Sequence, residues 1–191
     1  MTFPANQLRP NGGEIYCHIF ENQLTGVTRD AYWSVTVDFA PLLYGKDTFR
    51  TLAMVEWLQF RIRDFRDIKQ YRINLPDSSH AEASFYMTEH DNAAATSMLL
   101  SYIGDARFHV ELEMMVDFHG YLGGDANPVM RVAASTELQF TGLIVVPGNL
   151  DPKPDDEAAV ISTASQFLDL SGFDPPLKQG FRYLFRPRTR S

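Results

Sequence analysis

Imidazole and carboxylate groups alternate with apolar residues along 107–119, and this stretch is the best candidate in the chain for chemistry. If it is a strand, its polar members share one face, with about 7 Å between alternate residues. These members are His109, Glu111, Glu113, Asp117 and His119. Such groups ligate metals or transfer protons where they converge on one point. One strand face spreads them apart, so a solvated face paired with Arg or Lys across the sheet is the favoured interpretation.

Other residues that could take part in chemistry give a weaker signal in the sequence. A second cluster at the predicted ends of strands consists of His80, Glu89, His90 and Asp91, which also suit turns and helix caps. Cys17 falls on the apolar side of its predicted strand, which favours a buried and inert thiol. The chain has no phosphate loop, nucleophile elbow, paired-His zinc helix, Cys pair or calcium loop. We therefore expect no catalytic residue and no cofactor, with His109 and His119 as secondary metal candidates.

The C-terminal tail, residues 174–191, is basic and aromatic. Its cationic residues are Lys178, Arg182, Arg186, Arg188 and Arg190, and its apolar residues include Phe181, Tyr183, Leu184 and Phe185. An acidic body and a basic tail on one chain are self-complementary, which favours identical subunits as the partner. The predicted partner-binding residues are Arg182, Tyr183, Phe185, Arg186, Arg188 and Arg190 in the tail, and Glu111, Glu113 and Asp117 on the strand. Single-stranded nucleic acid is the alternative partner for this tail.

Composition narrows the class of protein. The 191 residues suit one domain, and the apolar share of 45% is enough for a real core. The net charge of −7 disfavours a general nucleic-acid binder. A single cysteine fits a reducing compartment, and neither a signal peptide nor a membrane-spanning apolar run is evident. These features predict a cytoplasmic protein, or a particle assembled in the cytoplasm, with no membrane partner.

The elements that position these residues follow from periodicity. Period-two alternation predicts strands over 14–20, 32–39, 71–75, 81–88, 107–119 and 130–146. The first two strands are expected to form a hairpin, and the last two a long antiparallel pair joined by a loop over 120–128. A turn is expected over 76–79.

Helical spacing predicts further elements. A helix over 47–66 would carry Leu52, Val55 and Leu58 on its inward stripe, and a helix over 155–170 would begin with acidic residues. Residues 92–103 fit a helix slightly better than a strand that turns at Gly104-Asp105.

These elements together predict an α+β fold. We expect a mainly antiparallel sheet of roughly six strands with two or three helices packed on it. The expected organisation is an N-terminal arm over 1–13, a single α+β domain over 14–173 and a C-terminal arm over 174–191.

Three functions fit this reading. The first is a non-enzymatic structural subunit of a larger assembly whose termini dock on neighbouring subunits; a virion or phage-tail subunit would suit the size and the arms by compositional analogy. The second is a small acidic protein that neutralises a partner, as toxin immunity proteins do. The third is an enzyme that uses the face from His109 to His119 or the cluster from His80 to Asp91.

Overall fold

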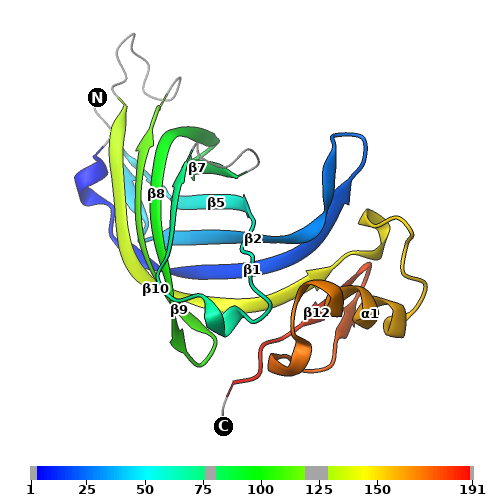
Figure 1. The fold of residues 1–191 in the computed structure, drawn as a ribbon. Helices are drawn as coiled ribbons and strands as arrows, with labels where there is room; N and C mark the ends of the chain where they lie inside the picture. The colour runs from blue at the N-terminus through cyan, green and yellow to red at the C-terminus, as the bar shows by residue number, and fades with distance from the viewer. Residues whose placement is uncertain (1–3, 76–80, 119–128, 190–191) are drawn as a thin grey trace.

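The computed structural model describes residues 4–75, 81–118 and 129–189, and in this part of the chain most residues belong to β-strands (Figure 1). The strands are β1 (Pro10–Asn22), β2 (Val27–Phe39), β3 (Leu42–Tyr44), β4 (Asp47–Phe49), β5 (Leu52–Leu58), β6 (Tyr71–Leu75), β7 (Glu82–Tyr86), β8 (His90–Gly104), β9 (Arg107–Val116), β10 (Met130–Val145), β11 (Leu177–Gln179) and β12 (Arg182–Phe185). The helices are α1 (Glu157–Phe167) and the 3-10 turns η1 (Ala5–Gln7), η2 (Phe65–Asp67), η3 (Pro147–Asn149) and η4 (Leu170–Gly172).

Seven strands close into a barrel. Their order is β1-β2-β5-β7-β8-β9-β10, and each neighbouring pair is antiparallel. The ring closes where β1 runs parallel to β10, so that Ile15 lies opposite Phe140 and Cys17 opposite Leu143. Closure removes the two free edges that an open sheet would present.

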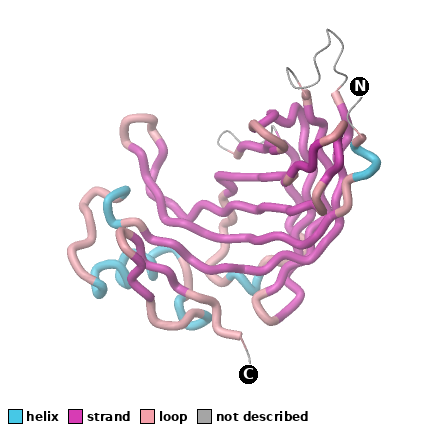
Figure 2. Tube along the Cα trace, turned by 180° about the vertical axis from the view of Figure 1, so that it is seen from behind, coloured by secondary structure: helices cyan, strands magenta, loops and turns pink. Residues whose placement is uncertain are grey.

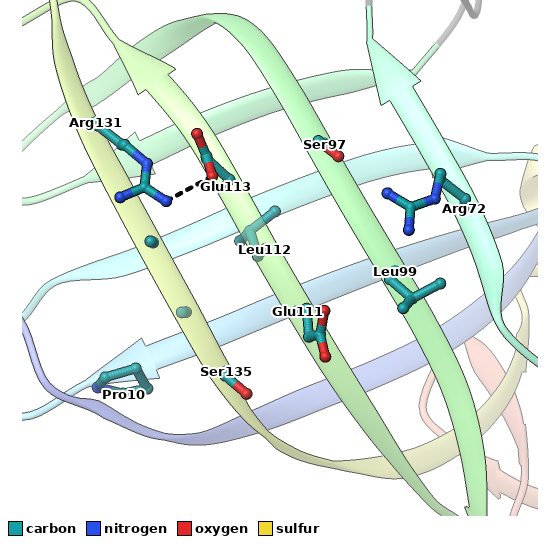
Figure 3. A pocket seen from close by; sticks show the side chains of 11 residues that line it. Pro10, Arg72, Ser97, Leu99, Glu111, Leu112, Glu113, Arg131 and Ser135 are labelled. Carbon is teal, nitrogen blue, oxygen red and sulfur yellow. Dashed lines mark hydrogen bonds and ion pairs between the residues drawn. The ribbon is translucent and has the colours of Figure 1, made fainter.

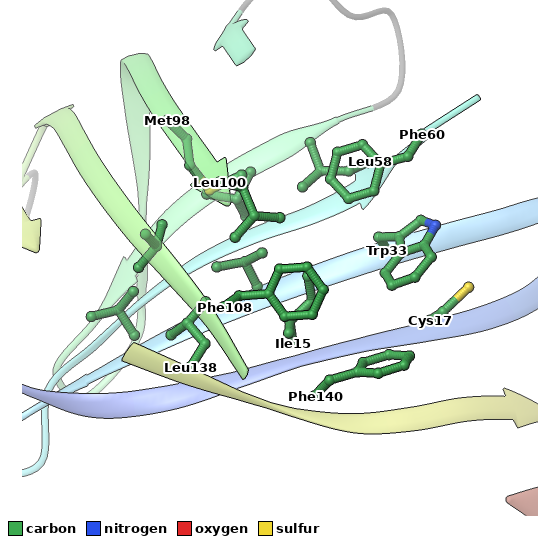
Figure 4. Close-up of a cluster of buried hydrophobic side chains, with 14 of the residues drawn as sticks. Ile15, Cys17, Trp33, Leu58, Phe60, Met98, Leu100, Phe108, Leu138 and Phe140 are labelled. Atoms are coloured by element: carbon green, nitrogen blue, oxygen red, sulfur yellow. The ribbon is translucent and has the colours of Figure 1, made fainter. Parts of the chain in front are cut away.

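Apolar side chains fill the interior of this barrel (Figure 4). Trp33 stacks on Phe140 with 5.5 Å between ring centroids, and Phe60 lies 5.5 Å from the other side of Trp33. The inward positions of β9 and β10 alternate with outward polar ones, as strand geometry requires. The interior is therefore a packed core, as in other small barrels.

The sheet continues beyond the barrel. The C-terminal half of β10 pairs with β1 on one side and with β12 on the other, and β12 carries β11 at the outer edge. Helix α1 lies beside this extension (Figure 1). Its Val160 and Ala164 are fully buried in the same core as Tyr183 and Phe185. Figure 2 shows from behind how β1 and β2 run from the barrel into the extension.

Several predicted elements are confirmed. The hairpin of β1 and β2 exists, and it is longer than the alternation alone suggested. The pair of β9 and β10 is antiparallel, with Glu113 opposite Ala133 and Glu111 opposite Ser135. The predicted C-terminal helix is α1, whose N-cap Asp156 accepts a hydrogen bond from the backbone N–H of Ala159 at 2.8 Å. The expected loop over 120–128 and turn over 76–79 lie outside the described residues.

The predicted helix over 47–66 is wrong. This segment forms β4, β5 and η2. Val55 and Leu58 both face the core although they are three residues apart, because a bulge with Trp57 at a positive φ of 60° inserts one extra residue between them. A spacing of three residues between buried apolar side chains is also typical of a helix.

The predicted helix over 92–103 is wrong as well. The segment belongs to β8, which pairs with β9 on one side and with β6 and β7 on the other. The segment is the hairpin alternative, but its two-residue turn is Asp105-Ala106, one residue later than expected, with positive φ angles of 49° and 54°. Gly104 ends β8 and pairs with Arg107. Leu99 and Ile103 are apolar but face outward, which obscured the alternation.

The α+β fold class is therefore corrected to a mostly β fold, a closed barrel with one α-helix in the described residues. Besides the bulge in β5, apolar residues on both faces of β5 and β8 remove the period-two signal of a half-buried strand. Residues of both predicted arms take part in the sheet, since β1 begins at Pro10 and the tail supplies β11 and β12.

Gly142→Ala is expected to loosen the C-terminal strands. Gly142 in β10 has a φ of 124°, and a Cβ atom there would collide with the backbone carbonyl oxygen of Phe185 in β12. We expect the free energy of unfolding to fall by more than about 1 kcal/mol, with faster tryptic cleavage after Lys178 and Arg182. Urea unfolding and limited proteolysis measure both effects.

The matched control is Gly148→Ala, since Gly148 lacks a positive φ and a Cβ atom there meets nothing within 4 Å. The control should behave like the unchanged protein. If Gly142→Ala also behaves so, the docking of β12 against β10 is not as described.

Candidate functional site

The outer face of β6, β8, β9 and β10 carries charged and polar side chains in register. One row across the strands joins Arg72, Leu99, Glu111 and Ser135 (Figure 3). The inward neighbours on these strands belong to the apolar core. This is the wet face that alternation in residues 107–119 predicted.

A shallow groove of about 590 Å³ runs over this face. It is lined by Arg72 and Arg131 at its two sides and by Glu111 and Glu113 between them (Figure 3). Arg72, Arg107 and Arg131 stand against Glu111, Glu113 and Glu137 on these strands, so their formal charges cancel. The face is balanced rather than acidic.

Two ion pairs cross this face. Arg131 donates to Glu113 at 2.7 Å, and this hydrogen bond keeps the pKa of the Glu113 carboxyl below its usual range. Arg107 donates to Glu137 at 2.9 Å. A general acid near neutral pH needs a raised carboxyl pKa, so Glu113 is poorly suited to that role.

The histidine candidates for a metal are not brought together in the described residues. His109 lies directly opposite Glu137, and its Nε2 is 3.2 Å from the hydroxyl of Ser135. His119 lies outside the described residues, as does His80 of the second cluster. In the described ranges, no group of three or more His, Cys, Asp or Glu side chains has the geometry of a metal site.

Two further predicted residues lie apart from the groove. Asp117 follows the end of β9 and is not among the groove residues, while Asp91 in β8 is buried. Cys17 is fully buried, and burial raises the pKa of its thiol well above the usual range. A buried thiol that resists ionisation is a poor nucleophile, in agreement with the predicted inert cysteine.

The predicted partner-binding residues of the tail have different surroundings. Tyr183 and Phe185 are 7% and 1% exposed and pack into this chain's own core. Arg182 and Arg186 are exposed. Arg188 pairs with Asp174 at 3.4 Å. Arg190 lies outside the described residues.

The outer face of the extension carries a row of apolar and aromatic side chains that the sequence did not reveal. Strand register aligns Leu177 of β11, Leu184 of β12, Ile144 of β10, His18 of β1 and Tyr32 of β2. We call these five residues the outer stripe. The opposite face of the same strands carries buried residues such as Val145 and Phe185, which share the core with α1.

The outer stripe is partly open to solvent. Leu177 is 49% exposed, and His18, Ile144 and Leu184 are half-buried. Tyr32 is 1% exposed, because the rings of His18, Phe20 and Trp57 cover it. Arg182 is exposed beside the stripe at one side, two residues along β12 from Leu184. Asp30 lies two residues along β2 from Tyr32 and directly opposite Phe20.

Aromatic rings enclose His18 at the centre of this face. Trp57 lies 5.2 Å from His18 between ring centroids, Tyr32 6.0 Å, and Tyr16 and Phe20 each 6.1 Å. Burial among these rings lowers the pKa of His18 to about 4. The imidazole is therefore neutral at physiological pH and acts as part of an apolar surface.

One signal in the sequence could have revealed the outer stripe. In β1 the residues Tyr16, His18 and Phe20 alternate with Ile15, Cys17 and Ile19, so both faces of this strand are apolar or aromatic. A strand that is apolar on both faces needs a cover on both. The interior supplies one cover, and the described residues leave the outer stripe partly exposed.

No family model, no curated protein and no solved structure matches this chain. The fold and its surfaces define it as a closed seven-stranded β-barrel protein with a sheet extension covered on one side by α1. Among the described residues no helix has the length and apolar character to cross a membrane.

Proposed function

We propose that this protein is a non-enzymatic subunit that assembles with identical subunits. The observation that supports this proposal is the outer stripe with its surrounding rings, a sheet face that is apolar yet partly exposed. A contiguous apolar face of this kind is typical of a protein interface. An identical subunit is the most economical partner, since both acidic and basic groups border the same face.

The other surface supports a binding role less well. The groove over β6, β8, β9 and β10 holds balanced and solvated charges, so it does not favour a strongly basic partner. The hydrogen bond from Arg131 lowers the pKa of Glu113, whereas a catalytic acid at neutral pH needs a raised pKa. Immunity-type neutralisation and enzymatic activity thus remain predictions from the sequence without a structural feature that favours them.

We also propose that the protein is located in the cytoplasm. A single buried thiol suits a reducing cytoplasm, where the subunit would be made and assembled. A virion or phage-tail particle remains one form that such an assembly could take.

The mass of the full chain in solution tests the proposal. We expect sedimentation or light scattering at about 1 to 100 μM to give a mass above that of one 21.7 kDa chain, and to show dissociation on dilution. A single-chain mass over this whole range would contradict self-assembly. Point variants are preferable to deletion of the tail, because Tyr183 and Phe185 belong to the core.

A further inference from the structure

We propose that the outer stripe is a two-fold interface, in which two copies of this chain pack their extensions face to face. This inference rests on the proposed self-assembly and deepens it, since it names the surface, the symmetry and the residues in contact. It follows from the order of side chains across the extension.

The symmetry follows from the order of the strands. The extension and its continuation into the barrel run in the order β11-β12-β10-β1-β2-β5. A two-fold axis parallel to the strands and between β10 and β1 exchanges the two halves of this order. It places β10 over β1 of the second copy, β12 over β2, and β11 over β5. Such a contact uses the same patch on both copies and therefore closes as a dimer.

Apolar groups meet apolar groups in this arrangement. Within the row of the outer stripe, Ile144 faces His18 of the second copy. Leu184 faces the half-buried rings that cover Tyr32, which is itself 1% exposed. Burial keeps His18 neutral, so the centre of the interface carries no formal charge.

Opposite charges meet at the border of the same face. Arg182 lies two residues from Leu184 on β12, and Asp30 lies two residues from Tyr32 on β2. Strands β10 and β1 are parallel, while β12 is antiparallel to β10 and β2 is antiparallel to β1. Strands β12 and β2 therefore run in the same direction, so Arg182 and Asp30 lie on the same side of the outer stripe. The axis that aligns Leu184 with the register position of Tyr32 therefore brings Arg182 over Asp30 of the second copy, twice in each dimer.

Both partners have room for this contact. Asp30 accepts hydrogen bonds from the backbone N–H of Ala31 at 2.7 Å and from Gln59 at 2.7 Å, and a carboxylate can accept more. Arg182 is exposed and has one long hydrogen bond of 3.3 Å, to Gln179. Charge pairs at the edge of an apolar contact set its register and its specificity.

A pair of charge reversals tests this interface. Arg182→Asp alone creates two Asp–Asp contacts in the dimer, and Asp30→Arg alone creates two Arg–Arg contacts. We expect each variant to raise the dimer Kd by roughly tenfold or more. When the two variants are mixed, each heterodimer contains one original Arg–Asp contact and one reversed contact. We expect the mixture to recover the dimer mass that neither variant shows alone.

Recovery in the mixture also controls for folding, because a misfolded variant could not be rescued by another chain. Ile144→Glu, at the centre of the stripe, is expected to give a single-chain mass with an unchanged far-UV circular dichroism spectrum. Arg131→Asp serves as the matched control on the charged groove of β10, and it should leave the mass of the dimer unchanged.

The outcomes separate this inference from the proposed function. If the unchanged chain self-assembles but the stripe variants and the mixture leave its mass unaffected, this interface is wrong and the proposed assembly uses another surface. If the unchanged chain stays a single chain up to about 100 μM, both the interface and the proposed function are overturned.

Discussion

Phe140→Ala is expected to lower the free energy of unfolding by about 4 kcal/mol, which is the typical cost of removing a buried ring and leaving a cavity. Phe140 is 1% exposed and belongs to the hydrophobic core. Its ring centroid is 5.5 Å from Trp33, 4.8 Å from Phe65 and 5.9 Å from Phe173. Urea unfolding followed by tryptophan fluorescence measures the loss, and Trp33 itself reports on the site.

Phe181→Ala is the matched control for this prediction. Phe181 carries the same side chain but is 79% exposed in the turn between β11 and β12. Its substitution should change the free energy of unfolding by less than about 0.5 kcal/mol. Equal effects of the two substitutions would mean that Phe140 does not occupy the core as described.

Lowering the pH from 7.5 to 5 is expected to remove about 2 kcal/mol of stability through His18. Burial lowers the pKa of His18 from 6.5 to about 4 in the folded chain. The unfolded chain therefore binds the proton first, and stability is fully present above pH 6.5 and declines as the pH falls towards 4. The rings in contact with the imidazole belong to Tyr16, Phe20, Tyr32 and Trp57. Burial raises the pKa of the Tyr32 hydroxyl above its usual value.

His18→Phe should flatten this pH dependence, because it keeps a ring in the cluster and removes the titrating group. Urea unfolding at one low protein concentration, between pH 5 and 7.5, gives the slope for each protein. His109→Phe, on the outer face of β9, should retain the slope of the unchanged chain. A slope that survives in His18→Phe would assign the effect to other groups.

The strands with one buried apolar face and one solvent-exposed polar face could be predicted from the sequence. Along β9, Phe108, Val110 and Leu112 alternate with His109 and Glu111, and only a strand places such a set on two faces. The helix α1 was also predictable, since the acidic residues at 155–157 suit the positive N-terminal end of a helix. The charged face with Glu111 and Glu113 followed directly from these local patterns.

The strands with two apolar faces could not be predicted in this way. In β5, Met54 and Trp57 are apolar outside while Val55 and Leu58 are apolar inside, and the bulge at Trp57 imposes a three-residue spacing. In β8, outward Leu99 has the same effect between inward Met98 and Leu100. Local periodicity cannot distinguish such strands from buried helices.

The net charge of the candidate groove also depends on which strands pair in the sheet. Glu111 and Glu113 make residues 107–119 look acidic along the chain, but Arg72 and Arg131 arrive from β6 and β10 across the sheet. The tail shows the same limit, since Tyr183 and Phe185 read as free aromatic anchors until β12 pairs with β10. In both cases the neighbours come from distant parts of the chain.

By itself, then, the sequence determined the alternating strands, the capped helix and the polar face of β9, because each depends on residues a few positions apart. Only the tertiary structure decided the closure of the barrel, the docking of the tail and the alignment of the outer stripe. These depend on contacts such as the one between β1 and β10, which are more than 120 residues apart along the chain. Strand register over that distance is set by how the whole core packs, and local periodicity does not encode it.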